Sequence, residues 1–158
     1  MTAVNGPGRH RAREAALQML YQWEVGRVSP HEAVVTYWPG RDAPPSADDE
    51  RADATPDVMV DEAGRTFANA LVAGTVSRVK ETDDLIAAHL KNWRIERVAV
   101  VDRLVMRLAI YELLTEPETP AKVVINEALE LARTFSGEEP VPLINGVLDA
   151  VRKTLKRD

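Results

Sequence analysis

The chain has 158 residues, enough for one domain with a buried core, because a chain of this size hides about 70% of its unfolded surface on folding. It contains no cysteine, which excludes disulfides, thiolate metal sites and cysteine nucleophiles. It also has no apolar run of the length that a membrane span or a secretory signal needs. These features predict a cytoplasmic protein that does not enter a membrane.

The formal net charge of −5 argues, taken alone, against binding to phosphate groups. The segment from Asp42 to Glu62, however, holds eight acids and one base. The rest of the chain is therefore slightly positive, and its bases gather near the two ends, at 9–13 and 152–157. Local basic patches of this kind can still bind nucleic acid.

Apolar residues recur at helical spacing along most of the chain, and no segment shows sustained alternation with a period of two. The pattern predicts helices at about 9–26, 30–38, 57–80, 82–91, 96–114, 121–135 and 142–155. We therefore expect an all-α fold, a compact bundle of about seven helices formed by a single domain over residues 1–158. Residues 1–8 are expected to be a disordered tail, and residues 39–56 an acidic mobile loop.

The first predicted helix combines a basic start with an apolar face. Six apolar residues fall on one arc at about 100° per residue, namely Ala12, Ala15, Ala16, Met19, Leu20 and Trp23. Three arginines, Arg9, Arg11 and Arg13, flank this arc and are expected to lie outside the bundle. Positive charge opposes the dipole at a helix N-terminus, so a binding function is the better explanation for the arginines.

Three blocks in chain order, at 9–23, 93–114 and 123–148, carry a family resemblance. The first is an arginine-rich opening followed by Ala-Leu-Gln-Met-Leu-Tyr, and the second contains Arg-Leu-Ala-Ile-Tyr-Glu-Leu. The third pairs Ile-Asn-Glu-Ala with Ile-Asn-Gly-Val-Leu-Asp. With these blocks the chain resembles the NusB family of bacterial transcription antitermination factors. The resemblance implies a NusB-like fold and a non-enzymatic RNA-binding factor that needs no cofactor or metal.

The resemblance also implies partners. Proteins of this family bind the boxA element of ribosomal RNA leader transcripts together with NusE, a protein of the small ribosomal subunit, and join the RNA polymerase antitermination complex. A competing interpretation is a helical protein-protein scaffold without specific RNA recognition. A third is the similar helical domain of ribosomal RNA methyltransferases, although no cofactor-binding domain follows here. The apolar stripes could also be shared between two copies, which leaves a homodimer open.

The residues implied to bind RNA are Arg9, His10, Arg11, Arg13, Tyr21 and Leu143. Tyr21 lies on the polar side of its helix, where it could stack on a base, receive the partner protein or cover the edge of the core. Leu143 stands where the family commonly has an aromatic residue, and it cannot stack as a ring does. Because a stacked ring contributes about 1–3 kcal/mol per base, the arginines are expected to carry more of the binding.

The residues implied to contact the partner are Arg107, Tyr111, Glu112 and Glu139, although Tyr111 and Glu112 could equally anchor the core helix. Asn126 and Asn145 are expected to make buried hydrogen bonds rather than to contact RNA. None of the three histidines has neighbours at the spacing of metal ligands, and no motif of a catalytic site is present.

Overall fold

The computed structural model describes residues 7–42, 60–91 and 94–158. These form α1 (Pro7–Gly26), α2 (Pro30–Asp42), α3 (Glu62–Ser77), α4 (Val79–Ala88), the short 3-10 helix η2 (Ile95–Arg97), α5 (Val100–Thr115), α6 (Ala121–Phe135) and α7 (Val141–Thr154). The described residues include no strand, and the predicted all-α fold is confirmed. None of their helices combines the length and hydropathy that a membrane crossing needs.

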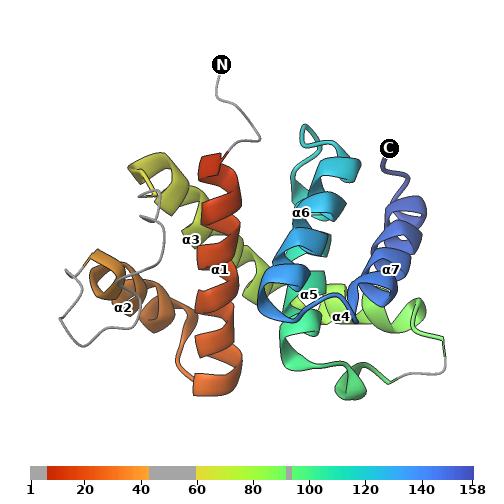
Figure 1. Ribbon diagram of the computed structural model, residues 1–158, viewed down its shortest axis with the longest axis horizontal. Helices are drawn as coiled ribbons and strands as arrows, with labels where there is room; N and C mark the ends of the chain where they lie inside the picture. The colour runs from red at the N-terminus through yellow and green to blue at the C-terminus, as the bar shows by residue number, and fades with distance from the viewer. Residues whose placement is uncertain (1–6, 43–59, 92–93) are drawn as a thin grey trace.

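The helices form two groups around α5. Figure 1 shows α1, α2 and α3 on one side and α4 to α7 on the other, with α1 and α6 side by side in the middle of the view. α5 packs against α1, α3, α4, α6 and α7. It also contributes a continuous run of buried apolar side chains, including Leu104, Val105, Met106, Leu108, Ala109 and Ile110. The helix predicted at about 96–114 is therefore confirmed, and it is the central helix of the core.

The apolar face of α1 is confirmed for Ala12, Ala15, Ala16, Met19 and Leu20, each at most 2% exposed. Leu17, which the pattern places on the polar side, is also buried at 3%. The reason is that α2, α3 and α5 pack around α1, so more than one arc of its surface is covered.

The close crossing of α3 and α5 depends on Gly74. A Cβ atom placed on Gly74 would lie 2.0 Å from the ring of Tyr111, so only glycine leaves room for that ring.

Two predicted boundaries are wrong. α2 continues through Pro39 to Asp42, because a proline near a helix end removes only one backbone donor. Thr82 does not start a helix but lies inside α4, where its hydroxyl donates to the carbonyl of Val79 at 3.0 Å. The predicted tail (1–8) and acidic loop (39–56) lie outside the described residues, except for 7–8 and 39–42, which are helical.

Candidate nucleic-acid interface

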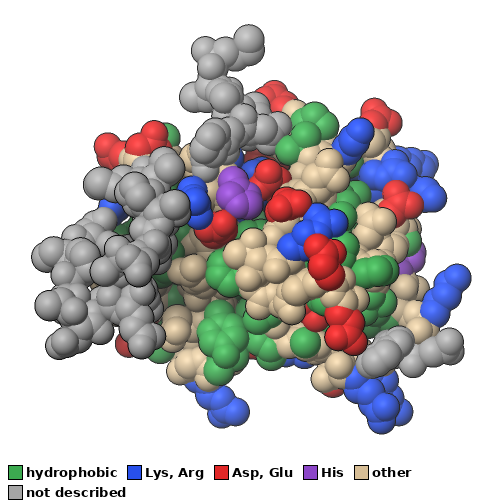
Figure 2. All heavy atoms as spheres, viewed as in Figure 1, with side chains coloured by type: hydrophobic (Ala, Val, Ile, Leu, Met, Phe, Trp, Pro, Cys, Tyr) green, Lys and Arg blue, Asp and Glu red, His purple; other side chains and the backbone are tan. Residues whose placement is uncertain are grey.

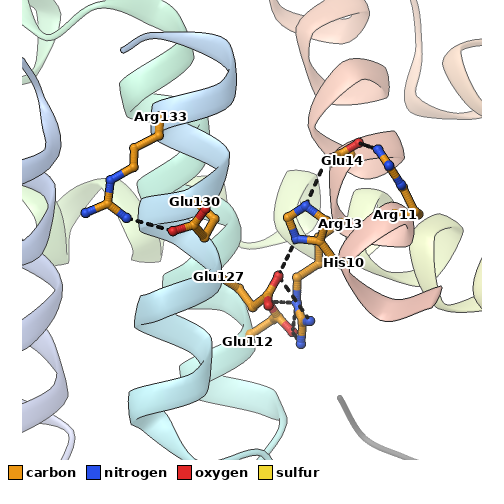
Figure 3. Close-up of polar contacts among 8 residues, drawn as sticks. All are labelled: His10, Arg11, Arg13, Glu14, Glu112, Glu127, Glu130 and Arg133. Atoms are coloured by element: carbon orange, nitrogen blue, oxygen red, sulfur yellow. Dashed lines mark hydrogen bonds and ion pairs between the residues drawn. The ribbon is translucent and has the colours of Figure 1, made fainter. Parts of the chain in front are cut away.

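Arg13 lies inside the bundle, with 2% of its surface exposed. Its Nε donates to both carboxylate oxygens of Glu112, at 3.1 and 3.0 Å, and its Nη2 donates to Oε1 at 2.9 Å. Figure 3 shows the guanidinium pointing from α1 to this carboxylate of α5. The prediction that Arg13 lies outside the bundle with the other arginines is therefore wrong, because a buried acid on another helix holds it.

Glu112 is likewise buried at 2% exposure. Burial raises the pKa of its carboxyl above the ordinary value, and the hydrogen bonds and charge of Arg13 oppose that rise. Two alternatives were open for Glu112, contact with the partner protein and anchoring of the core helix. The structure supports the second. Its side chain is not accessible to a partner protein.

His10 lies between two carboxylates at the start of α1, as Figure 3 shows. Its Nδ1 is 2.7 Å from Oε2 of Glu127 on α6, and its Nε2 is 2.9 Å from Oε1 of Glu14. Arg11 donates to the other oxygen of Glu14 at 3.0 Å. The predicted basic end of α1 is therefore interleaved with the carboxylates of Glu14 and Glu127.

Arg9 has a different environment. Its guanidinium lies 3.8 Å from the centre of the Phe67 ring, a cation-π contact between α1 and α3. Among the described residues no acidic side chain pairs with it. Because the ring binds the face of the guanidinium, the N–H groups at its edge can still donate to a phosphate.

An apolar groove lies between the far half of α1 and the end of α6. It is a cavity of about 430 Å³ formed by residues of α1, α2, α5 and α6, namely Leu17, Gln18, Tyr21, Gln22, Tyr37, Val101, Leu104 and Phe135. Tyr21 is 40% exposed and Phe135 is 37% exposed. Figure 2 shows hydrophobic side chains gathered over the lower part of α1 on this face.

Phe135 continues the apolar stripe of the helix predicted at 121–135, yet its ring is exposed. It is the last residue of α6, just before the turn at Gly137, so no following helical turn covers it. The position of the helix end was the signal that could have identified it. Tyr21 and Phe135 together offer two aromatic rings in one groove.

Leu143 is half-buried at the start of α7. With Glu139 it lines a second cavity, of about 490 Å³, whose other walls include Arg97, Asp102 and Ser136. The Ser136 hydroxyl donates to the Asp102 carboxylate at 2.6 Å and so fixes this wall. Since Ser136 directly follows Phe135, the two cavities lie on adjoining parts of the surface.

The predicted partner residues on α5 have structural contacts. Arg107 is 6% exposed and binds the carboxylate of Asp83 on α4 through Nε at 2.7 Å and Nη2 at 2.9 Å. Tyr111 is half-buried against Gly74. Of the predicted partner residues, only Glu139 is exposed. The side chain of Arg107 is therefore held inside the bundle and does not contribute an exposed group to the partner surface expected on α5.

Asn126 and Asn145 are both exposed and line a cavity of about 300 Å³ between α6 and α7. The prediction that they make buried hydrogen bonds is wrong, because both helices turn these positions away from the core. Within the described ranges no three side chains of the metal-binding types lie close enough together to hold an ion.

Comparisons with known proteins identify the family. The model of the NusB family matches residues 10–153. The transcription antitermination protein NusB of Solibacter usitatus is 43% identical over 93% of this chain and 90% of its own length, and that of Myxococcus xanthus is 40% identical over 94% and 97%.

Solved structures agree. T. maritima NusB has a TM-score of 0.73 at 32% identity and covers 92% of this chain and 90% of its own. A structure of the antitermination factors NusB and NusE in complex with dsRNA has the same fold, with a TM-score of 0.74 at 24% identity, over 93% of this chain and 97% of that one. The chain belongs to the NusB family.

Proposed function

We propose that the chain is a transcription antitermination factor that binds the boxA element of ribosomal RNA leader transcripts together with NusE, within the RNA polymerase antitermination complex. The observation that carries this proposal is that Arg9 and Arg11 begin the same helix that forms one wall of an aromatic groove. Cations that bind phosphate and rings that stack on bases are the two elements that single-stranded RNA recognition needs. A protein that acts on nascent transcripts would be located in the bacterial cytoplasm, which agrees with the location that the sequence predicts.

The arrangement suits a strand of RNA that follows α1. Tyr21 follows His10 by eleven positions, which corresponds to about 16 Å along a helix. Phosphates would lie at the arginine end, and bases would reach the rings of Tyr21 and Phe135 at the other. Leu143 would extend this contact as an apolar surface without a ring.

Arg13 has an indirect role in this proposal. Its three hydrogen bonds to Glu112 fix the first turns of α1 against α5 and so position Arg9 and Arg11. Of the residues implied to contact NusE, Glu139 has an accessible side chain beside Leu143. The RNA and the partner protein would then meet near the start of α7.

The test is a binding measurement with boxA RNA and a scrambled RNA of equal length, over a series of salt concentrations, with and without NusE. The variant Arg9→Ala/Arg11→Ala removes two phosphate contacts and is expected to lower the salt slope for single-stranded RNA by about 1.4. The matched control is Arg78→Ala/Lys80→Ala, which removes two exposed charges, one just before α4 and one in its first turn. This control is expected to bind as the unchanged chain does.

The competing scaffold without RNA specificity predicts a different result. It requires equal affinity for boxA and scrambled RNA in the presence of NusE, because phosphate contacts alone carry no sequence information. That outcome would contradict the proposed function. Preference for boxA that disappears only when the groove residues Tyr21 and Phe135 are changed to alanine would support it.

A further inference from the structure

Two exposed asparagines line one pocket between α6 and α7. Asn126 of α6 and Asn145 of α7 border the same cavity of about 300 Å³. Within the described ranges neither carboxamide has a hydrogen-bond partner. Both residues occupy helix interiors, where asparagine is a mediocre helix former. The two side chains therefore do not stabilise the helices that carry them, and their donors and acceptors are available to a ligand.

Gly146 follows Asn145 on the exposed surface of α7. Glycine inside a helix is less favourable than alanine. A Cβ atom placed on Gly146 would meet no atom of the described residues within 4 Å, so the packing of the chain itself does not require a glycine here. The missing side chain leaves the backbone of α7 open to close approach by a ligand.

The other residues that line the pocket indicate the chemistry of that ligand. Ile125, 7% exposed, supplies an apolar surface. Lys122, exposed in the first turn of α6, is a cation without an acidic partner among the residues that the structure describes. Arg152, in contrast, already donates to Asp149 at 2.8 Å. A volume of about 300 Å³ is at the lower end for ligand pockets, so it suits one ring system rather than a helix of a partner protein.

The pocket lies at the same end of the molecule as the arginines of α1. Figure 1 shows that α1 and α6 begin, and α7 ends, at the upper end of the view, with α6 between the other two. Asn126 directly precedes Glu127, whose carboxylate lies 2.7 Å from His10 of α1. Residues 152–157 contain four bases, and Figure 2 shows Lys and Arg side chains over the end of α7. The fold thus brings the two basic ends of the sequence to one end of the bundle.

We propose that this pocket binds one unstacked base of the RNA, adenine in preference to the other three. Single-stranded RNA is recognised by hydrogen bonds to the edges of bases that are splayed out of the stack. A carboxamide carries an acceptor oxygen and an amino donor, which match the N6 amino group and N7 of adenine. Asn126 and Asn145 bind the edge of the base, and Ile125 contacts its ring. Lys122 contacts the phosphate that accompanies the base.

The RNA part of this inference rests on the proposed function, whereas the affinity of the pocket for a nucleotide does not. The first test measures the binding of boxA RNA in the presence of NusE. Asn126→Ala/Asn145→Ala is expected to weaken binding about tenfold, as the loss of a bidentate contact to a base does. Because alanine is the better helix former, the thermal unfolding of this variant should occur at the same temperature or a higher one.

The matched control is Thr36→Ala/Ser77→Ala. It removes two exposed hydroxyls from α2 and α3, each of which donates to a carbonyl of its own helix. The control is expected to bind boxA RNA as the unchanged chain does. Equal affinity of the unchanged chain and of Asn126→Ala/Asn145→Ala would overturn the proposal while the proposed function stands.

The second test uses the full chain without RNA or NusE. NMR follows the side-chain amide signals of Asn126 and Asn145, identified by their loss in the alanine variants, while AMP, UMP or inorganic phosphate is added. AMP is expected to shift both signals, UMP to shift them less, and phosphate to leave them unchanged. Equal shifts with AMP and phosphate would refute recognition of a base, and so would no shift with either nucleotide. Equal shifts with AMP and UMP would refute the preference for adenine.

Two further outcomes separate this inference from its alternatives. If the unchanged chain does not bind boxA RNA, the proposed function fails, and the titration with AMP still decides whether the pocket binds a base. If Asn126→Ala/Asn145→Ala weakens the binding of NusE in the absence of RNA, this surface receives a protein and the proposal is overturned.

Discussion

Replacement of Arg13 by methionine should destabilise the fold strongly. The change leaves the carboxyl group of Glu112, 2% exposed, without its three hydrogen bonds. Removing one partner of a buried ion pair costs about 3–5 kcal/mol of the free energy of unfolding. Because burial already raises the pKa of Glu112, the carboxyl can take up a proton when Arg13 is absent. We therefore expect a value near the lower end, about 3 kcal/mol.

The matched variant Arg13→Met/Glu112→Leu removes both charges and is expected to recover most of the lost stability, since apolar residues of similar size often replace a buried pair without loss. Urea unfolding followed by circular dichroism measures both values. A double variant no more stable than the single one would refute the reasoning, and so would a single-variant loss below about 1 kcal/mol. The folded double variant should also keep its RNA affinity, because Arg9 and Arg11 are unchanged; a loss as large as that of Arg9→Ala/Arg11→Ala would show that Arg13 contacts RNA.

Three further predictions concern stability. Gly74→Ala would place a Cβ 2.0 Å from an aromatic ring of α5, so thermal unfolding should show a loss of about 1–3 kcal/mol. Arg157→Ala removes donors to three backbone carbonyls at and after the end of α5 and should lower the melting temperature, whereas the neighbouring exposed Lys156→Ala should not. Hydrogen bonds from Arg152 hold the pKa of Asp149 below 3.8, so this carboxylate stabilises the fold above that pH and the contribution is lost as pH falls through the lowered value. In the Asp149→Asn variant, the decrease in the free energy of unfolding at acid pH should be smaller by this contribution. Unfolding measured over a series of pH values checks it.

The fold follows closely from hydrophobic periodicity. α6 begins and ends at the predicted residues, Ala121 and Phe135, and the apolar run of 96–114 becomes the central helix α5. Periodicity succeeds here because it reports which arc of a helix loses contact with water, and the core of a bundle consists of such arcs. It is less reliable at helix ends, where capping and the next helix decide, as Thr82 and Pro39 show.

Charged residues near the edge of an apolar arc were the main source of error. Arg13 and Glu112 are 99 positions apart in the chain, and neither helix alone shows that the other supplies a buried counter-charge. The same holds for Arg107 with Asp83 and for His10 with Glu127. Which pairs form depends on the register between helices, and periodicity within one helix contains no information on that register.

These ion pairs change which residues are expected to contribute most to the RNA affinity. From the sequence, the absence of an aromatic residue at Leu143 implied that the arginines carry more of the RNA affinity. In the structure Arg13 is buried with Glu112, and Arg11 already donates to Glu14. A phosphate must therefore compete with a carboxylate for Arg11, and exchange of one anionic partner for another yields less free energy than binding to an unpaired cation. Under the proposed function the groove would supply the compensation, because exposed Phe135 adds a second ring beside Tyr21, and stacking on rings does not depend on the charge of its neighbours.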